Sequence, residues 1–166
     1  MLSKRWKDSR AELQRIVLPE DTNVIGGLYG GRLVEWIDNI ASIVAFKHAN
    51  GPALTGSIDS LFFLSPIRMG DIVRMESRIN YVTRTTMEVQ TDVFTEDVST
   101  GKPRVTTQAY LTYVAIDGKG KPKEVPGLIL ETDDDRKRFK EGETRSVARK
   151  ETLAKVRLES GYSKSS

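Results

Sequence analysis

The chain has 166 residues and no cysteine, with 38% hydrophobic and 30% charged residues. This composition is typical of one globular domain, and it excludes disulfides, thiolate metal ligands and a cysteine nucleophile. The single histidine, His48, excludes any catalytic or metal site that needs two histidines from one chain. No segment reaches the roughly 18 apolar residues of a membrane span, and the first ten residues are too charged for a signal peptide. We therefore expect a cytoplasmic protein.

The positive charge is concentrated at the C-terminal end. Residues 136–166 contain ten Lys or Arg and four Glu, a net charge of +6, whereas the whole chain carries +3. A basic segment of this kind can bind nucleic acid, an acidic membrane or a phosphorylated cofactor, and it serves solubility or subunit contacts equally well. Few aromatic residues and no recognisable binding motif accompany it, so nucleic acid is not the partner that we expect.

The first predicted elements are a short strand and a long apolar helix. Residues 12–18 favour a strand that ends at Pro19, and a loop then leads into a helix over residues 31–48. Residues 50–52, Asn-Gly-Pro, end this helix. Apolar side chains cover most of its circumference, and a narrow polar stripe is formed by Glu35, Asp38, Asn39 and Ser42. A helix of this kind must be nearly surrounded by protein.

Four long strands are predicted next, over residues 54–64, 71–83, 85–96 and 104–116. Their apolar and polar residues alternate, which implies an antiparallel sheet with one buried face. The order of elements predicts an α+β fold in which a curved antiparallel sheet wraps around one central helix. After the strands, acidic residues 133–135 are expected to cap a C-terminal helix that Gly142 interrupts. We expect residues 161–166 to be disordered.

The segment from Asn23 to Asp38 carries the strongest functional pattern. The double glycine Gly30–Gly31 stands where the helix begins, and Asp38 follows about two turns later. A helix that begins at glycines presents free backbone N–H groups and the positive end of its dipole, which suits an oxyanion or a polarised carbonyl. A carboxylate nearby can act as a base or as a nucleophile. The pattern therefore indicates an acyl-transfer site.

These residues also have structural interpretations. The polar stripe can be a solvated face of the helix, the paired glycines can permit close helix–sheet packing, and Asn23 can be a loop or capping residue. His48 lies near the helix end, where we expect it to interact with the helix dipole and not to take part in catalysis. Asp59 and Asp71 are interpreted as structural residues, because Gly70–Asp71 indicates a turn into a strand.

Two features of the chain resemble the hot-dog-fold acyl-CoA thioesterases. They are the order of elements and the helix motif Asp-Thr-Asn-x-x-Gly-x-Leu-Tyr-Gly-Gly-x-Leu-x-x-Trp-Ile-Asp. The chain is most similar to the bacterial short-chain and brain-type acyl-CoA hydrolases. The resemblance covers residues 10–130, and residues 55–71 and the turn at 82–87 support it. It implies a hot-dog domain over residues 1–130, followed by a basic C-terminal extension, residues 131–166, that is partly helical.

The resemblance implies hydrolysis of acyl-CoA to a free fatty acid and CoA, in fatty acid metabolism, without a cofactor or a metal. Asp38 matches the catalytic carboxylate of the family and Asn23 its catalytic asparagine. Gly30 falls where related enzymes polarise the thioester carbonyl with a backbone N–H, and Ser42 falls where some carry a hydroxyl that positions water. Two routes stay open for the carboxylate, which either attacks the carbonyl to form a mixed anhydride or deprotonates water.

The resemblance also implies contacts with CoA and suggests a second class of function. The predicted contacts with CoA lie at the turn that holds Arg84, Thr85 and Thr86. Neighbours of pantetheine are predicted at Gly56, Ser57 and Asp59. Arg84 has an alternative role as an ordinary cation at a strand end. The alternative to an enzyme is a non-catalytic hot-dog regulator that binds acyl-CoA and contacts DNA through its basic extension.

The spacing within the helix makes a further prediction about assembly. Gly30 and Asp38 are eight residues apart, so they lie roughly 12 Å apart along the axis of one helix. One thioester carbonyl is too small to reach both. We therefore expect a homodimer in which Asn23 and Gly30 of one chain act with Asp38 and Ser42 of the other. The family resemblance implies hexamers built as trimers of dimers.

Overall fold

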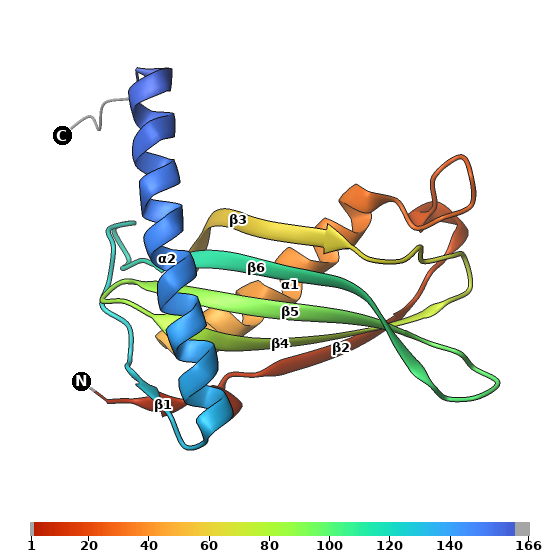
Figure 1. Ribbon diagram of the computed structural model, residues 1–166, viewed down its shortest axis with the longest axis horizontal. Helices are drawn as coiled ribbons and strands as arrows, with labels where there is room; N and C mark the ends of the chain where they lie inside the picture. Colours follow the sequence, from red (N-terminus) through yellow and green to blue (C-terminus); the bar gives the residue numbers. More distant parts are fainter. Residues whose placement is uncertain (1, 162–166) are drawn as a thin grey trace.

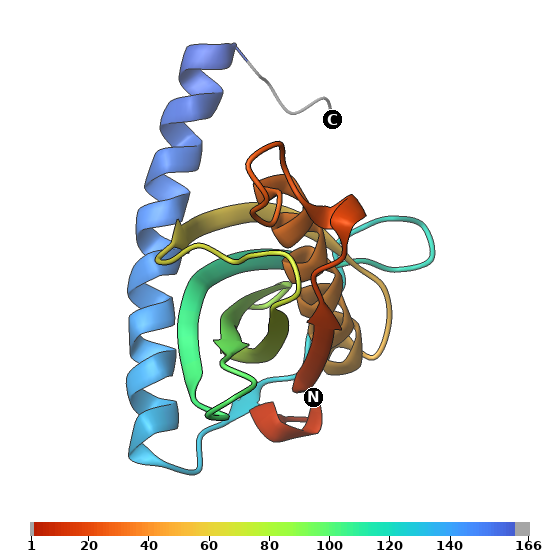
Figure 2. The same ribbon diagram turned by 90° about the vertical axis from the view of Figure 1, so that its right-hand side faces the viewer.

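Residues 2–161 are described by a computed structural model of the chain, and they form a curved sheet around a central helix. The helix α1 (Gly30–Ala49) lies in the concave face of a five-stranded antiparallel sheet (Figures 1 and 2). The spatial order of the strands is β2 (Ala11–Ile16), β4 (Ile72–Val82), β5 (Thr86–Glu96), β6 (Pro103–Ala115) and β3 (Ala53–Phe63). The predicted α+β architecture is thus confirmed, and β2 and β3 form the two edges of the sheet.

The packing of α1 against the sheet makes the core of the protein. Side chains spaced three or four residues apart on α1 are fully buried, which is the periodicity of one helical face. They pack against alternate residues of the strands, and the buried set includes Ile37, Ile40, Ala41, Val44, Val73, Met75 and Ile79. The helix is nearly surrounded by protein, as predicted, and the apolar exceptions within a single chain are Ile43 and Phe46, which are nearly half exposed.

Short elements near the two ends of the chain were not predicted. β1 (Lys4–Arg5) pairs in parallel with β7 (Leu128–Ile129), and the 3-10 helices η1 (Trp6–Asp8) and η2 (Pro19–Asp21) flank β2. Elements of two or three residues show no periodicity in the sequence, so only contacts with the rest of the fold define them. The predicted long elements end within two residues of the observed ones, apart from the C-terminal helix.

The C-terminal helix, α2 (Asp133–Ser160), is continuous, so the predicted interruption at Gly142 is wrong. Its N-terminus is fixed by a capping box, in which Thr132 and Asp135 each accept a hydrogen bond from the other's backbone N–H, both at 3.1 Å. A Cβ atom at Gly142 would lie 2.5 Å from the Cβ of Tyr81. The glycine therefore lets the helix approach the sheet closely.

The helix α2 lies on the outer face of the sheet, opposite α1 (Figure 2). Gly161 follows the helix in the left-handed conformation. Disorder was predicted for residues 161–166, and residues 162–166 of this range lie outside the described part. Between residues 2 and 161, no helix combines the length and the apolar composition needed to cross a membrane.

Candidate active site

Asp38 is the centre of a hydrogen-bonded cluster on the inner side of the sheet. The hydroxyl of Thr55, near the start of β3, donates to Asp38 Oδ1 at 2.8 Å. The phenol of Tyr113, on β6, donates to the same oxygen at 2.6 Å. Ser42 lies one turn after Asp38 on α1, and its hydroxyl donates to the Tyr113 oxygen at 3.4 Å. Two hydroxyls from two strands therefore hold the carboxylate directly, and Ser42 on α1 supports one of them.

The cluster leaves one carboxylate oxygen available. Burial, together with the hydrogen bond to Asp38, raises the pKa of Tyr113, so its phenol stays protonated and remains a donor. Both donors act on Oδ1 of Asp38, and in the described part of the chain Oδ2 has no hydrogen-bond partner. An oxygen held in this way can attack an acyl carbon or accept a proton from water.

Asn23 organises a loop at one end of the partial barrel that the curved sheet forms around α1. Its Oδ1 accepts hydrogen bonds from the backbone N–H groups of Ile25 and Gly27, both at 3.1 Å. The structural interpretation of Asn23 as a loop residue is therefore confirmed. Its side-chain amide N–H₂ makes no hydrogen bond with any described residue, and the neighbouring Val24 and Ile25 are almost entirely exposed. The amide is thus free to donate to another molecule.

The first turn of α1 offers backbone donors. The N–H groups of Arg32 and Leu33 both bond to the carbonyl of Tyr29, so those of Gly30 and Gly31 precede the first bonds of the helix. A Cβ atom at Gly31 would lie 2.7 Å from the ring of Tyr29, which is 60% exposed and can move aside. The helix N-terminus can therefore hold an oxyanion through the backbone N–H of Gly30.

The two groups do not meet within one chain. Gly30 and Asp38 both belong to α1, and eight residues of helix separate them by roughly 12 Å along the axis. The loop that precedes α1 lies at one end of the barrel, and the turn between β4 and β5 lies at the other (Figure 1). One chain thus contains the carboxylate half and the amide half of a site at separate places.

The predicted CoA contacts at the β4–β5 turn lie on the surface. Arg84 is exposed, and its guanidinium is 3.5 Å from the carboxylate of Glu124, which agrees with a strand-end cation. The hydroxyls of Thr83 and Thr86 lie 2.7 Å apart and close the turn, and the carbonyl of Thr85 accepts from the N–H of Ala115. The predicted role of these residues in binding CoA stays a prediction.

The predicted pantetheine neighbours lie on β3, and two of them face α2. Asp59 accepts hydrogen bonds from the hydroxyls of Ser57 and Thr112 and from the guanidinium of Arg149 on α2. The structural role of Asp59 is thereby confirmed, and its contact with pantetheine stays a prediction. A Cβ atom at Gly56 would lie 3.3 Å from the carbonyl oxygen of Thr112, which is a tight approach between strands.

Thr55 and Tyr113 are the residues of this cluster that the sequence did not reveal as functional. In the sequence, Thr55 is only the first residue of the matching segment 55–71, and Tyr113 is one of many residues in a predicted β-strand. A tyrosine at an inward-facing position is the available signal, because a buried hydroxyl requires a hydrogen-bond partner. Its partner, Asp38, lies on a distant segment and contacts it because α1 packs against β6.

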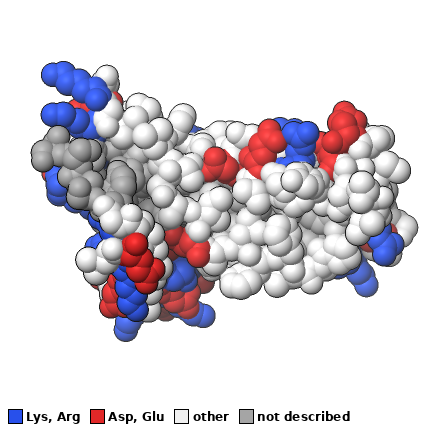
Figure 3. Space-filling model, turned by 90° about the horizontal axis from the view of Figure 1, so that it is seen from above, with Lys and Arg blue, Asp and Glu red and all other residues white. Residues whose placement is uncertain are grey.

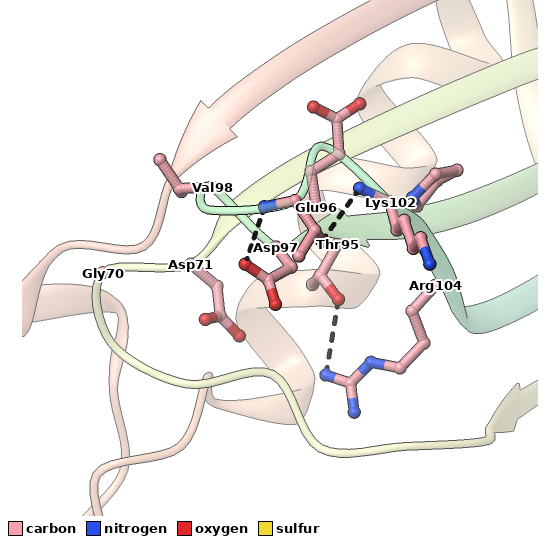
Figure 4. A pocket seen from close by; sticks show the side chains of 10 residues that line it. Gly70, Asp71, Thr95, Glu96, Asp97, Val98, Lys102 and Arg104 are labelled. Atoms are coloured by element: carbon pink, nitrogen blue, oxygen red, sulfur yellow. Dashed lines mark hydrogen bonds between the residues drawn. The ribbon is translucent and has the colours of Figure 1, made fainter.

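A separate hollow of about 660 Å³ lies between the start of β4 and the β5–β6 hairpin. Figure 4 shows its mixed lining, which includes the carboxylates of Asp71, Glu96 and Asp97 and the cations of Lys102 and Arg104. None of the predicted site residues lines it. The candidate catalytic residues therefore lie elsewhere.

Residues 25–102 match the model of the thioesterase superfamily. The chain is also 40% identical over 129 residues to YkhA of Bacillus subtilis, named as an acyl-CoA thioester hydrolase, and this match covers 78% of the chain and 75% of YkhA. The chain belongs to the acyl-CoA thioester hydrolases of this superfamily. Its predicted hot-dog fold is thus confirmed.

The solved structures extend the likeness to the C-terminal helix. An acyl-CoA hydrolase from Staphylococcus aureus, in complex with butyryl-CoA, CoA and CoA disulfide, is 36% identical with a TM-score of 0.91, and covers 96% of this chain and 98% of its own. An apo-hexameric acyl-CoA thioesterase is 38% identical with a TM-score of 0.88 and covers 93% of this chain and 99% of its own. The resemblance is therefore not limited to residues 10–130.

A mammalian relative is considerably longer. The cytosolic acyl coenzyme A thioester hydrolase of Mus musculus is 33% identical over 144 residues, which are 86% of this chain. The matched part makes up 38% of the mouse protein.

Proposed function

We propose that the protein hydrolyses acyl-CoA to a free fatty acid and CoA at composite active sites between two copies of the chain. The observation that carries this proposal is the division of the site. Asp38 has one anchored and one available oxygen, whereas the available amide donors of Asn23 and Gly30 belong to a separate end of the barrel. Both halves are present, and one chain does not bring them together.

In this mechanism, the N–H of Gly30 and the side-chain amide of Asn23 from one copy bind the thioester oxygen. As negative charge develops there, a single such donor contributes about 10² to 10³ in rate. Asp38 of the other copy either attacks the carbonyl carbon and expels the CoA thiolate, or deprotonates a water that attacks. In the first route water then hydrolyses the mixed anhydride. Thr55 and Tyr113 hold the carboxylate in either case.

The surface around β3 supports the assembly. β3 is an edge strand, and an unpaired edge is a template for pairing with another chain. Large apolar side chains are exposed along it and on the adjoining flank of α1, namely Leu54, Ile58, Phe62, Phe63, Leu64, Ile43 and Phe46. Figure 3 views the molecule from this side and shows a broad area with few charged residues.

We propose that a second copy covers this surface, with the two β3 edges side by side and antiparallel. This two-fold arrangement brings opposite ends of the two barrels together, so the loop of one copy approaches the carboxylate of the other. Assembly into a hexamer, as a trimer of such dimers, belongs to the same proposal, and the hexameric thioesterase supports it. We also place the enzyme in the cytoplasm, because the similar mouse protein is named as cytosolic. We place its reaction in fatty acid metabolism, because the proposed product is a free fatty acid.

The test is CoA release from butyryl-CoA and a series of longer acyl-CoAs, comparing the wild-type chain with Asp38→Ala. Mixing Asn23→Ala chains with Asp38→Ala chains then tests the shared site. Verified heterodimers should regain one working site, because one interface unites the two intact halves. Absence of recovery contradicts the shared site, and tight acyl-CoA binding without turnover by the wild type supports the regulator instead.

The two chemical routes differ in where an isotope first appears. Single-turnover hydrolysis in ¹⁸O-labelled water places label in the protein only if Asp38 forms a mixed anhydride. If water attacks directly, the label enters the fatty acid and the carboxylate of Asp38 stays unlabelled.

A further inference from the structure

The contacts of α2 follow the order of the strands. Asp135 pairs with Arg78 of β4, and Arg145 forms a two-bonded ion pair with Glu88 of β5. The guanidinium of Arg145 also stacks on Tyr110 of β6. The last of these contacts joins Arg149 to Asp59 on the edge strand β3. The helix therefore crosses the outer face of the sheet from β4 to the β3 edge.

The helix does not end at this edge. Residues 150–160 continue it for roughly 16 Å, about the width of three strands, and all of them are exposed. Figures 1 and 2 show this segment extending beyond the sheet. An isolated helix of this length is marginal in water, so tertiary contacts normally stabilise such a segment.

The face of α2 that contacts the sheet becomes apolar beyond the edge. Gly142, Ser146 and Arg149 lie on the sheet-facing stripe, which continues at spacings of four and three residues through Leu153 and Val156. Leu153 is 44% exposed and Val156 is 51% exposed. The stripe is thus suited to an outer sheet face that one copy of the chain does not supply.

A second stripe on α2 is complementary to itself. Seven exposed residues share one flank of the helix, rotated by one residue, about 100°, from the sheet-facing stripe. In order they are Lys137, Glu141, Thr144, Ala148, Thr152, Lys155 and Glu159. The spacing and the chemistry are symmetric about Ala148, with small residues in the middle and opposite charges at equal distances on either side. An antiparallel copy of the helix would therefore match this stripe.

The centre of the stripe coincides with the edge of the sheet. Ala148 directly precedes Arg149, the residue that contacts β3. A two-fold axis between two β3 edges would therefore pass close to the midpoint of the self-complementary stripe. The strand edge and the charge pattern are independent features, and both indicate the same axis.

We propose that α2 pairs with α2 of a second copy in antiparallel orientation, across the β3 edge. In this pair Ala148 meets its own symmetry mate, Glu141 contacts Lys155 of the partner subunit, and Lys137 contacts Glu159 of the partner subunit. Residues 150–160 then lie on the outer face of the partner subunit's sheet. This sheet covers Leu153 and Val156. The inference rests on the dimer of the proposed function. The helix pair would join the two copies of that dimer on the face opposite the active sites.

The chain has no cysteine, so a single introduced thiol gives an unambiguous test. Ala148→Cys should form a covalent dimer under mild oxidation or with a short bismaleimide, and reductant should reverse the oxidised product. Lys150→Cys is the matched control, because this position is also exposed but lies about 200° further around the helix. Efficient cross-linking of Ala148→Cys alone supports the pair. Equal cross-linking of both variants, or of neither, overturns it.

Charge exchange tests the register of the pair. Glu141→Lys and Lys155→Glu each place like charges together twice in a symmetric dimer, and either should raise the dimer dissociation constant by about three- to thirtyfold at low salt. The double variant restores opposite charges and should restore the dissociation constant measured by sedimentation. Circular dichroism checks that α2 remains helical. Additive weakening in the double variant overturns the register.

Measurements of CoA release keep this inference separate from the proposed function. If the thiol at position 148 does not cross-link selectively while dimers still release CoA, the helix pair is wrong and the composite thioesterase stands. If the cross-link and the charge restoration succeed but no acyl-CoA is hydrolysed, the interface stands and the proposed reaction is wrong.

Discussion

The cluster around Asp38 and the loop that holds Asn23 differ in how many of their polar groups have partners within the chain. Asp38 is held by two hydroxyl donors from the same chain, at 2.8 and 2.6 Å. The loop is held by the side chain of Asn23 and by backbone hydrogen bonds to residues 67–69, and the side chains of Val24 and Ile25 are exposed to solvent. Bonds within a single chain therefore fix one half of the candidate site, whereas the other half presents an amide N–H₂ that has no partner among the described residues.

This difference teaches how a small fold can restrict catalysis to the assembled state. Each chain folds around its own core, so the carboxylate needs no partner to be positioned. In the proposed dimer, the donors to the substrate carbonyl come close to this carboxylate only when a second copy docks. The comparison can be tested with substitutions of two kinds of group. The first kind is hydrogen-bonded within one chain, and the second kind is proposed to act with the second chain.

Replacing Asp38 by Asn should have the largest effect. The amide keeps the size and an oxygen acceptor for Thr55 and Tyr113, but it is neither a base nor a competent nucleophile. We expect kcat for acyl-CoA hydrolysis to fall by about 10²- to 10⁴-fold. Thermal unfolding and sedimentation should match the wild type. Activity close to that of the wild type would remove Asp38 from the chemistry.

Replacing Asn23 by Asp separates the two functions of that side chain. The carboxylate still accepts from the N–H groups of Ile25 and Gly27, so the loop should keep its shape and the melting temperature should change little. The donor N–H₂ is lost, and we expect kcat to fall by about 10²- to 10³-fold. Steady-state kinetics and calorimetry measure both effects. A loss of stability without a loss of kcat would leave Asn23 as a loop residue only.

Replacing Tyr113 by Phe tests the positioning of the carboxylate. The variant removes one hydrogen bond to a charged group, so we expect kcat to fall roughly 10- to 100-fold while KM changes little. The substitution also leaves Ser42 without its acceptor. A parallel rise in KM with unchanged kcat would instead indicate that Tyr113 serves substrate binding.

A pH titration of stability gives the smallest expected effect. It tests the contacts of His48, which lie within one chain. His48 is fully buried between the hydroxyl of Ser9 and the carbonyl of Pro126, and burial lowers its pKa. This corrects the expectation of a charged partner for the helix dipole. The native state binds fewer protons than the unfolded state, so stability is complete above about pH 6.5 and falls as the pH drops below it.

The contribution of His48 can be isolated by substitution. His48→Gln should flatten the decline of the melting temperature between pH 7 and 5, although the variant is less stable overall. The fall in stability at acidic pH should not depend on protein concentration, because the contact lies within one chain. An unchanged slope in the variant would assign the decline to other groups.

The sequence predicted the long elements well and the contacts of the site poorly. Apolar periodicity and glycine or proline breaks defined α1 and the four strands to within two residues. Gly142 was misread because its backbone freedom is visible in the sequence, whereas the nearby Cβ of Tyr81 is not. Thr55 and Tyr113 escaped notice for the same reason, since each needs Asp38 from a distant segment to gain a role. The catalytic roles of Asp38, Asn23, Gly30 and Ser42 stay predictions.

The sequence by itself determined the helix with its double glycine, the carboxylate two turns later and hence the separation of roughly 12 Å between them. This follows from local geometry, because the rise of a helix does not depend on its surroundings. Only the tertiary structure decided which oxygen of Asp38 is anchored, which residues anchor it and which strand edge and helix flank remain open. These depend on packing between segments far apart in the chain, so they are not encoded in any single local pattern.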